Sequence, residues 1–382
     1  MGSRAARSSF VALLLVPGFA SAQVEVAPGI TYAGDDAGVH VLDVALDHPQ
    51  VTFEVSEPEM RGLTVSEYAT QRGATVSLNG GPFSIGSFAP EGLTVGSGRR
   101  WAGSRDDGEH ALLAVDIDGC GGIYPTAVHG ARERWMYHAV GGTAVVVTEG
   151  IAVSPRCDGD GCASRAQSAV GLSSDGRRML LVAVEEATPT EVGELLASRG
   201  AWVGMLLDGG PSTAMFVGEE LVNRPSDGVE RRVGSHIGVF SGRGPRWWDV
   251  RGVVTGQPEV DVEIRTFWDQ RIDGRRTVPW GGNEGDGLFQ FMPVPYRNVR
   301  IVTPDRCLFT GFTGPEDVRL DWWIEPGSTC PPAECTRVAE AAATTEPTCT
   351  EAGGGAAAAW PVLGGAILAL GVTGLVASRR RS

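Results

Sequence analysis

Apolar and polar positions form short runs through most of the first 240 residues, and the pattern predicts short strands with a few helices among them. Runs at 39–47 and 111–119 are rich in apolar residues and partly alternate, as half-buried strands do. The stretch LTVSEYATQRGATVSLNGG instead predicts a short helix, followed by a strand that ends at Asn79.

A second helix is predicted where Thr190, with Glu194 nearby, forms an N-terminal capping pattern. The amphipathic pattern continues to about Arg199, and the apolar run after it predicts a strand that reaches Asp208. Strands interspersed with helices predict an α+β fold with a mixed sheet for residues 23–243.

The pattern changes after the stretch SGRGPRWWD, whose Gly, Pro and Arg content marks a domain boundary. Short alternating strands separated by Gly and Asp turns predict a small all-β sandwich over residues 244–332. The runs at 250–254 and 287–302 resemble strands of carboxypeptidase-regulatory domains, which implies a spacer or a weak carbohydrate-adhesion module. Residues 333–355 are rich in Ala, Thr, Glu and Pro and predict a linker.

Both ends of the chain carry targeting patterns. Residues 1–22 combine basic residues, an apolar core and a small-x-small site, which predicts a secretory signal peptide. Residues 356–382 contain an uncharged stretch long enough to cross a membrane core of about 30 Å, followed by three arginines, and predict a transmembrane helix. Together with Cys349 this end resembles the myxobacterial-type C-terminal sorting signal, which implies processing near Cys349 and retention at the cell surface.

Charge and cysteine content narrow the choice of partners and compartment. The formal net charge is −14, and the two targeting ends hold five arginines and no acids, so the rest carries about −19. A surface this acidic repels polyanions, which argues against nucleic acid as a partner. Seven cysteines in an exported chain predict disulfides with one left over. Cys157 and Cys162 flank a segment that suits a disulfide-closed turn better than a calcium loop, and Cys120 has no obvious mate.

Four stretches of the first region combine the residue types of a ligand site: SLNGGPFS (77–84), SRAQSAVGLSSDGRRMLLVAVE (164–185), LLDGGPSTAMF (206–216) and ERRVGSHIGVF (230–240). The first and third each place one polar residue, Asn79 or Asp208, at the end of a strand and before Gly-Gly-Pro. Glycines at such positions permit positive φ and let a ligand reach backbone N–H groups. A plain turn explains either motif taken alone.

In this order and rough spacing the four stretches resemble the phosphodiester glycosidase family. The resemblance covers most of residues 30–243 and is most specific at the Asp208-Gly209-Gly210 turn and at the strand 236–240. It implies hydrolysis at the anomeric carbon of a sugar that is linked through phosphate to another group. Pro211 stands where the family has a third glycine, and this removes one backbone N–H from the turn.

The resemblance assigns a role to each candidate residue, and most of these roles have a structural alternative. The catalytic candidates are Asp208 as the essential carboxylate, His236 as an acid for the leaving phosphate and Glu185 as a second carboxylate. The substrate-binding candidates are Asn79, Gly80, Gly81, Arg165, Gly209, Gly210, Ser212 and Thr213, the last two at the N-terminus of a helix. The alternatives are helix capping for Asp208, Ser212 and Thr213, an Asx turn for Asn79, a surface ion pair for Arg165 and a packed structural ring for His236.

These observations lead to two main hypotheses for the function, besides a structural envelope protein without a ligand, which leaves the paired Gly-Gly-Pro turns unexplained. The first is an exported hydrolase that cleaves a sugar-1-phosphodiester linkage at the cell surface, and the alternative is a non-catalytic glycan-binding or adhesion protein on the same fold. Pro211 and the lack of an evident second carboxylate favour the alternative, whereas the ordered presence of all four motifs favours the enzyme. No spacing indicates a metal site and no cofactor is expected, although a divalent cation is compatible with a phosphate substrate. The expected partners are a glycan-phosphate and, before processing, the membrane, with nucleic acid excluded.

Overall fold

The computed structural model describes most of the first region and the strands of the second. The described residues are 23–105, 108–116, 119–125, 136–155, 162–242, 247–254, 256–266, 268–280, 283–295, 298–304, 306–312, 321–324, 335, 337 and 338.

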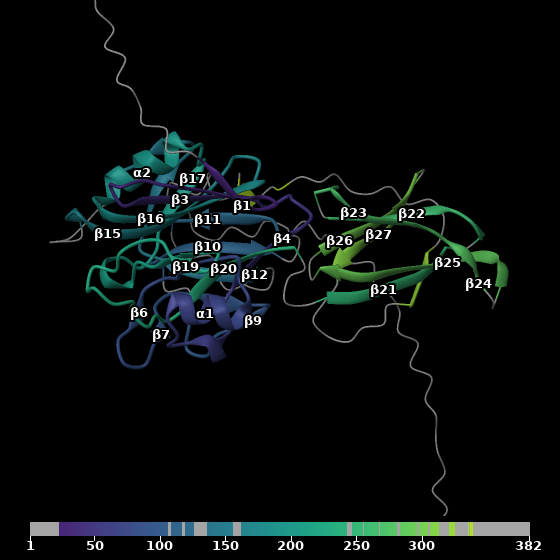
Figure 1. Cartoon of the computed structure of the whole chain (residues 1–382), viewed down its shortest axis with the longest axis horizontal. Helices are drawn as coiled ribbons and strands as arrows, with labels where there is room; N and C mark the ends of the chain where they lie inside the picture. Colours follow the sequence, from purple (N-terminus) through teal and green to yellow (C-terminus); the bar gives the residue numbers. More distant parts are fainter. Residues whose placement is uncertain are drawn as a thin grey trace, which may run out of the picture. The chain divides into compact units, whose positions relative to one another are not determined.

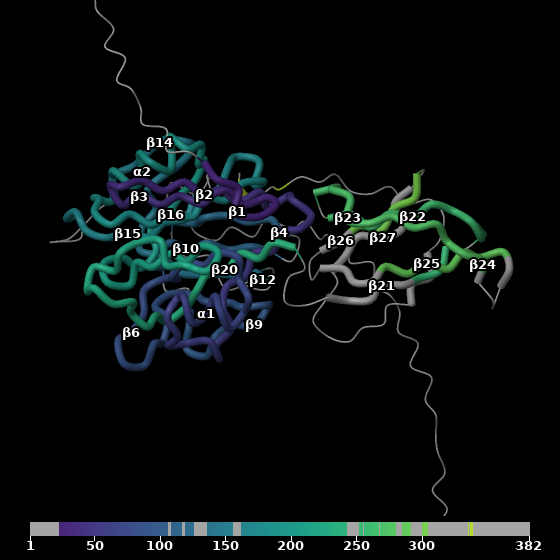
Figure 2. The backbone as a smooth tube through the Cα atoms, in the orientation of Figure 1, coloured from purple at the N-terminus to yellow at the C-terminus, as the bar shows by residue number. Residues whose placement is uncertain are grey.

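The first region is built on one large antiparallel sheet of eight strands (Figure 1). In spatial order its strands are β1 (Val24–Ala27), β2 (Ile30–Gly34), β3 (Val39–Ala45), β16 (Arg178–Ala187), β15 (Arg165–Leu172), β17 (Val203–Leu206), β13 (Ala144–Thr148) and β14 (Ile151–Ala152). Strands far apart in the chain are therefore neighbours, and β3 pairs along its length with β16 (Figure 2).

Two five-stranded sheets share one core with the large sheet. The β5 sheet contains, in spatial order, β19 (Glu220–Leu221), β18 (Met215–Val217), β5 (Val76–Asn79), β20 (His236–Ser241) and β4 (Val51–Val55). The β10 sheet contains β11 (Gly121–Tyr124), β10 (Ala111–Asp116), β12 (Met136–Gly142), β8 (Thr94–Gly96) and β9 (Arg99–Arg100). A small hairpin, β6 (Phe83–Ser84) with β7 (Ala89–Pro90), follows the end of β5. All three larger sheets supply apolar side chains to the main core, among them Leu42, Leu78 and Leu113, each with no exposed surface.

Two short α-helices cover the outer faces of this arrangement. Helix α1 (Val65–Arg72) begins with a capping box between Thr64 and Glu67, ends at a left-handed Gly73, and packs on the β5 sheet. Helix α2 (Pro189–Ser198) packs on the large sheet through Val192 and Leu196. A 3-10 turn, η1 (Pro58–Met60), precedes α1.

The capping residues of α2 differ from the prediction. Its box joins Thr188 to Glu191 rather than Thr190 to Glu194. Pro189 then occupies the first turn, where a missing N–H costs nothing.

The prediction of an α+β fold with a mixed sheet is wrong. Apart from residues 337 and 338, the described residues contain α-helix only in α1 and α2, of 8 and 10 residues, and the strand pairs of the first region are antiparallel. The large sheet explains the error, because α2 covers one of its faces and the main core covers the other. Strands buried on both faces have long apolar runs, as in β16, and such runs are also typical of parallel α/β sheets.

The second region contains two four-stranded sheets that share a core. One has the order β24 (Val278–Trp280), β25 (Asn283–Pro295), β21 (Trp247–Val254) and β28 (Asp321–Ile324), with β21 and β28 parallel. The other has the order β23 (Arg271–Arg276), β22 (Asp261–Thr266), β26 (Asn298–Thr303) and β27 (Arg306–Phe312). Side chains from both sheets form the core: Val254, Val262, Ile264, Phe289, Phe291 and Ile301.

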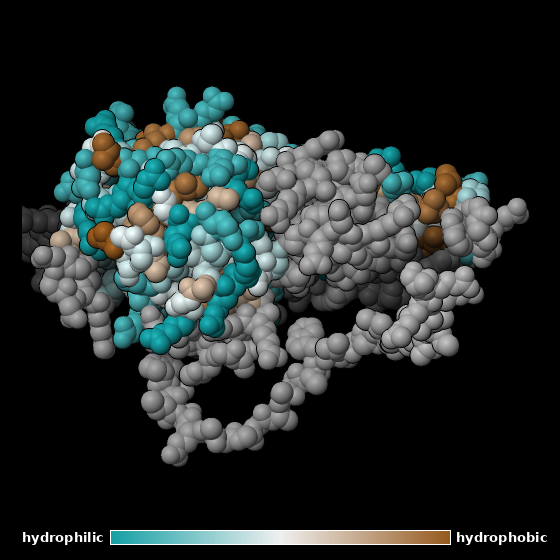
Figure 3. All heavy atoms as spheres, turned by 90° about the horizontal axis from the view of Figure 1, so that it is seen from below, coloured by the Kyte–Doolittle hydropathy of each residue, from teal (hydrophilic) through white to brown (hydrophobic). Residues whose placement is uncertain are grey.

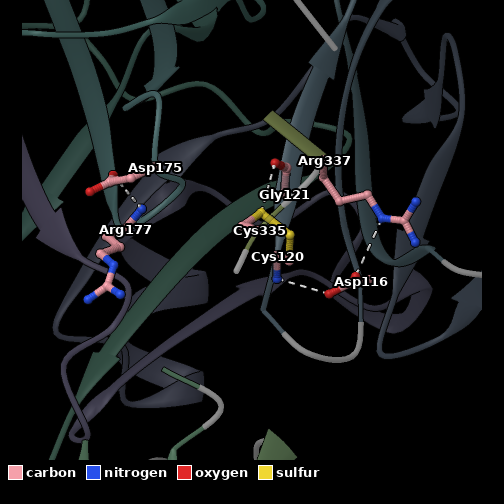
Figure 4. Close-up of a disulfide and its surroundings, with 7 residues drawn as sticks. All are labelled: Asp116, Cys120, Gly121, Asp175, Arg177, Cys335 and Arg337. Carbon is pink, nitrogen blue, oxygen red and sulfur yellow. Dashed lines mark hydrogen bonds and ion pairs between the residues drawn. A yellow bond between two sulfur atoms is a disulfide. The ribbon is translucent and has the colours of Figure 1, made fainter. Parts of the chain in front are cut away.

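A disulfide joins the first region to a short segment near residue 335 (Figure 4). Cys120, which had no obvious mate in the sequence, is bonded to Cys335 across a sequence separation of 215. Arg337 forms an ion pair with Asp116, and Val338 is fully buried in the main core. This segment is therefore part of the packing of the first region, although it follows the second region in the chain.

The predicted Cys157–Cys162 disulfide, signal peptide and transmembrane segment fall wholly or partly outside the described residues. Cys162 is disulfide-bonded, but its predicted mate Cys157 lies outside them. The predicted signal peptide (1–22) and transmembrane segment (356–382) also lie outside them and stay predictions. Within the described part of the chain, no helix has the length and apolar character that a membrane span requires.

The surface seen in Figure 3 is mainly hydrophilic where the structure describes it, with hydrophobic residues scattered among polar ones. The most exposed large apolar side chains include Ile85 and Val229, which lie in surface loops next to the motif residues. Single exposed apolar residues of this kind are normal for a surface in contact with water.

Candidate active site

The strands β5 and β17 end beside each other, and this brings the Asn79 and Asp208 turns together. The Asp208 N–H donates to the Gly80 carbonyl at 3.1 Å, and the Gly80 N–H donates to the Ser235 carbonyl at 2.8 Å. Strand β15, which begins at Arg165, lies next to β17 in the large sheet. The four sequence motifs thus meet at the junction of the large sheet and the β5 sheet.

Asn79 connects these turns through its side chain, which has no exposed surface. Its amide nitrogen donates to the Asp208 carbonyl at 2.8 Å and to the Gly80 carbonyl at 3.1 Å. Its amide oxygen accepts from the Ser168 hydroxyl at 2.6 Å and from the Ala214 N–H at 3.3 Å. Two donors and two acceptor sites are all that a carboxamide has. The side chain is therefore saturated by protein partners, which argues against a direct bond to a sugar hydroxyl.

The glycines of the two turns serve different purposes. A Cβ atom on Gly80 would collide with Ser235, and one on Gly81 would collide with the Gly141 carbonyl oxygen. A Cβ on Gly209 would lie 2.9 Å from the Ala166 carbonyl oxygen. These three glycines allow chain segments to pack against one another, which is a different role from the ligand approach that the sequence suggested.

Gly210 differs from the other three glycines. Its φ is +60°, and a Cβ there would meet nothing within 4 Å. It is the one glycine of the pair of turns that combines a left-handed backbone with open space beside it.

The segment after the Asp208 turn is not the helix that the sequence predicted. Gly210–Ser212 form a single 3-10 turn (η4), and the chain then enters β18. The Ser212 and Thr213 amides bond back to the carbonyls of Gly209 and Gly210, at 3.4 and 3.1 Å. A helix N-terminus with free amides is therefore absent here. Pro211 fits the turn because its position needs no N–H donor.

Asp208 is half-buried, and its surroundings contain groups that raise the pKa of its carboxyl and groups that lower it. Burial raises the pKa of the Asp208 carboxyl above its ordinary value. The hydrogen bond from the Ser212 side chain, the positive charge of Arg231 and a backbone hydrogen bond from Gly209 limit that rise in pKa, followed by the charge of Arg165. A carboxylate in this setting is desolvated, yet it remains close to two cations.

The two arginines near Asp208 come from different segments. Arg165 is exposed at the start of β15, and it forms no ion pair within the described residues. Arg231 lies in the loop between β19 and β20 and forms an ion pair with Asp227 at 3.1 Å. Arg165 was predicted from the sequence, whereas Arg231 was not, because nothing in ERRVGSHIGVF separates it from its arginine neighbour.

Glu185 is half-buried near the C-terminal end of β16, at the same edge of the large sheet as Arg165, which pairs with Ala187. Its side-chain contacts nevertheless lie outside the Asp208 turn. Its carboxylate accepts from the Arg224 N–H at 2.9 Å and lies 3.9 Å from His40 Nε2. His40 Nδ1 in turn bonds the Tyr32 hydroxyl at 2.7 Å. Glu185 thus holds the loop between β19 and β20 in place through Arg224, which is a structural role and not that of a second catalytic carboxylate.

His236 is packed beneath the site rather than facing it. The ring has no exposed surface and stacks on Tyr68 with centroids 4.6 Å apart. Its Nε2 donates to the Leu63 carbonyl at 3.1 Å, and its Nδ1 lies 3.3 Å from the Ser56 hydroxyl. Burial lowers the pKa of His236 to about 4. Both ring nitrogens are occupied and the ring is neutral near pH 7, which argues against the general-acid role.

The Asp208 turn therefore offers a half-buried carboxylate and an open glycine backbone, with Arg165 beside it and the charge of Arg231 acting on the carboxyl. Among the described residues no group of three or more His, Cys, Asp or Glu side chains is arranged to hold a metal ion. Ser168 and Asn223 also position the turns and were missed. Ser168 bonds Asn79, which is 89 residues away in the sequence, and Asn223 bonds across the β18–β19 hairpin through a side chain that no motif distinguishes.

Comparison with known proteins identifies the region that contains this site. Residues 72–240 match the family model described as phosphodiester glycosidase. The solved catalytic domain of zebrafish N-acetylglucosamine-1-phosphodiester α-N-acetylglucosaminidase, auto-inhibited by its pro-peptide, is 20% identical with a TM-score of 0.45, over 56% of this chain and 81% of that chain. A hypothetical protein from Synechocystis is 16% identical with a TM-score of 0.43, over 56% of this chain and 62% of that chain. No curated protein sequence matches the chain.

Proposed function

Because residues 72–240 match the phosphodiester glycosidase family model, we propose that this protein hydrolyses a sugar-1-phosphodiester at the site around Asp208. In the reaction, the bond between the anomeric carbon and the phosphate oxygen breaks. The phosphate group leaves with the electron pair of that bond. Water supplies the hydroxyl group of the free sugar, and the remaining proton passes to the phosphate monoester or to solvent.

The observation that carries this proposal is that Arg165 lies beside the Asp208 turn, with its Nε 3.7 Å from the place a Cβ atom would take on Gly209. The charges of Arg165 and Arg231 both lower the pKa of the Asp208 carboxyl, which supports the same arrangement. A carboxylate is required at the anomeric carbon, as nucleophile or as base toward water. Guanidinium groups bind phosphate oxygens with two parallel hydrogen bonds and neutralise their charge. One site thus offers a group for each half of a sugar-phosphate linkage.

The single carboxylate is compatible with this chemistry because of the leaving group. Ordinary glycosidases use a second carboxylic acid to protonate a leaving alcohol. A phosphate monoester has a second pKa of about 6, so near neutral pH it leaves as a stable anion that requires charge neutralisation more than protonation. In this proposal Arg165 supplies that charge, Gly210 allows the phosphate to approach the backbone, and Asn79 and Glu185 position the turns and the neighbouring loop.

We further propose that the protein acts outside the cell, at the cell surface, on a glycan-phosphate. The support is in the sequence of the two ends, where a signal-peptide pattern and an apolar segment with terminal arginines flank the described regions. Surface labelling of intact cells with a reagent that does not cross membranes tests the location. Labelling only after the cells are broken would refute it.

The function is tested by measuring free sugar released from a panel of sugar-1-phosphodiesters by the purified chain. The variant is Asp208→Asn, and the matched control is Asp175→Asn, which removes a carboxylate at the turn between β15 and β16. We expect turnover by the parent and by the control, and none by Asp208→Asn. If the folded parent releases no sugar from any member of a broad panel but binds glycans, the hydrolase hypothesis is refuted and the glycan-binding hypothesis takes its place.

A further inference from the structure

The loop that carries Arg231 is tied at both ends to the two turns of the site. We call residues 222–235, between β19 and β20, the arginine loop. At its start, the buried Asn223 side chain donates to the Thr213 carbonyl at 2.9 Å and accepts from the Met215 N–H at 2.7 Å. At its end, the Ser235 carbonyl accepts from Gly80. Both anchors therefore lie on the segments that flank Asp208.

Further bonds hold the body of the arginine loop against the first region. The Glu230 carboxylate accepts from the Ser66 N–H at 2.8 Å, at the start of α1. The Val233 N–H donates to the Leu63 carbonyl at 3.0 Å. The loop is thus a positioned element of the site, and its charged side chains have defined surroundings.

The two adjacent arginines of the loop have different partners. Arg232 bonds the Gly62 carbonyl at 2.8 Å and the Glu67 carboxylate at 3.0 Å, so it is committed to the segment around α1. Arg231 pairs with Asp227, which lies in the same loop. Arg231 also lies four residues before Ser235, whose carbonyl accepts from the same Gly80 residue that accepts from the Asp208 N–H. In agreement with this position, its charge lowers the pKa of Asp208.

The Arg231–Asp227 pair is a weak one, because both side chains are substantially exposed, 36% and 48%. Exposed ion pairs contribute little to stability, since water and salt screen them. A phosphodiester oxygen offers a guanidinium stronger, paired hydrogen bonds than this geometry provides. An anionic ligand at Asp208 would therefore compete successfully with Asp227 for Arg231.

We propose that Arg231 binds the phosphodiester oxygens of the substrate, and that Asp227 holds Arg231 in the free protein until the substrate replaces it. This inference rests on the proposed function, because it names the group that recognises the charged half of the linkage. Arg231 and Arg165 then contact the phosphate from two different segments. Neutral glycosides lack the charge that draws Arg231 from Asp227, so the pair selects for phosphodiesters.

The test measures equilibrium binding to the full chain of two probes, a sugar-1-phosphodiester and the methyl glycoside of the same sugar. We expect Arg231→Gln to weaken binding of the phosphodiester at least about tenfold and to leave the methyl glycoside unchanged, because a charge-assisted pair is lost. Asp227→Asn should tighten phosphodiester binding, up to about fivefold, because it removes a weak competitor. Arg232→Gln is the matched control and should change neither affinity by more than about twofold.

The outcomes separate this inference from the proposed function. If Arg231→Gln binds and hydrolyses the phosphodiester as well as the parent, the role of Arg231 is refuted while the hydrolase stands. An equal loss of phosphodiester affinity in Arg232→Gln would also refute it, since the loss would then follow from the positive charge of the loop as a whole and not from a contact made by Arg231. If the folded parent binds no phosphodiester at all, both proposals fail. Should Arg231→Gln not fold, Asp227→Asn decides, because unchanged or weaker binding by that variant contradicts the competition.

Discussion

Replacing Asn79 by alanine should destabilise the first region far more than replacing another buried polar residue of the same strand. Asn79 makes four hydrogen bonds with no exposed surface, to Asp208, Gly80, Ser168 and Ala214. In the alanine variant the Asp208 carbonyl and the Ala214 N–H each lose the side-chain partner that the structure gives them. The turn that presents Asp208 then loses its connection to β5.

The magnitude follows from the buried groups that are left without partners. Each such group costs about 1–3 kcal/mol, so two backbone groups give a loss of about 2–6 kcal/mol in the free energy of unfolding. The matched control is Ser77→Ala on the same strand, where a fully buried hydroxyl donates one bond to the Ile237 carbonyl at 2.9 Å. Removing that single donor should cost about 1 kcal/mol.

Urea denaturation of both variants, analysed by linear extrapolation, measures the difference. Asn79→Asp provides a second check, because it keeps the acceptor oxygen but sets a carboxylate against the Asp208 and Gly80 carbonyl oxygens. It should be at least as unstable as Asn79→Ala. If Asn79→Ala lies within about 1 kcal/mol of Ser77→Ala, the role of Asn79 as the connection between the turns is refuted.

Two further predictions concern pH and Glu185. Burial lowers the pKa of His138 to about 3 and that of His236 to about 4, so both fold as neutral rings, and stability is complete above the unfolded value of 6.5. The free energy of unfolding should fall as the pH drops from 6.5 toward 4, by up to about 1.4 kcal/mol per pH unit for each histidine. Urea denaturation at several pH values measures this dependence. If the unfolding free energy of His138→Gln changes with pH as steeply as that of the parent, the prediction is contradicted. Glu185→Gln keeps the acceptor for the Arg224 N–H and should retain most of the kcat, whereas Glu185→Ala should raise KM by loosening the arginine loop. Steady-state kinetics check this, and a loss of kcat by orders of magnitude in Glu185→Gln would make Glu185 a catalytic carboxylate instead.

Local patterns in the sequence were sufficient for individual elements and for the family. The predicted strands at 39–47 and 111–119 are confirmed as β3 and β10, and the run that ends at Asn79 is confirmed as β5. Both helices were predicted because amphipathic periodicity is encoded within a few residues, although the predicted cap of α2 was wrong in its residues. The predicted family is confirmed over residues 72–240, since its motifs are short contiguous stretches.

The fold class and the roles at the site depended on contacts that no local pattern contains. The sequence alone determined that Asn79 ends a strand and that Asp208 closely follows one, each before a glycine turn. Only the tertiary structure decided that Asn79 is saturated by Asp208, Ser168 and Ala214, residues 89 to 135 positions away. It likewise decided that the charge of Arg231 acts on the Asp208 carboxyl, whereas its neighbour Arg232 pairs with Glu67. The physical reason is that hydrogen bonds and charges act through space, whereas periodicity and capping report only on neighbours along the chain.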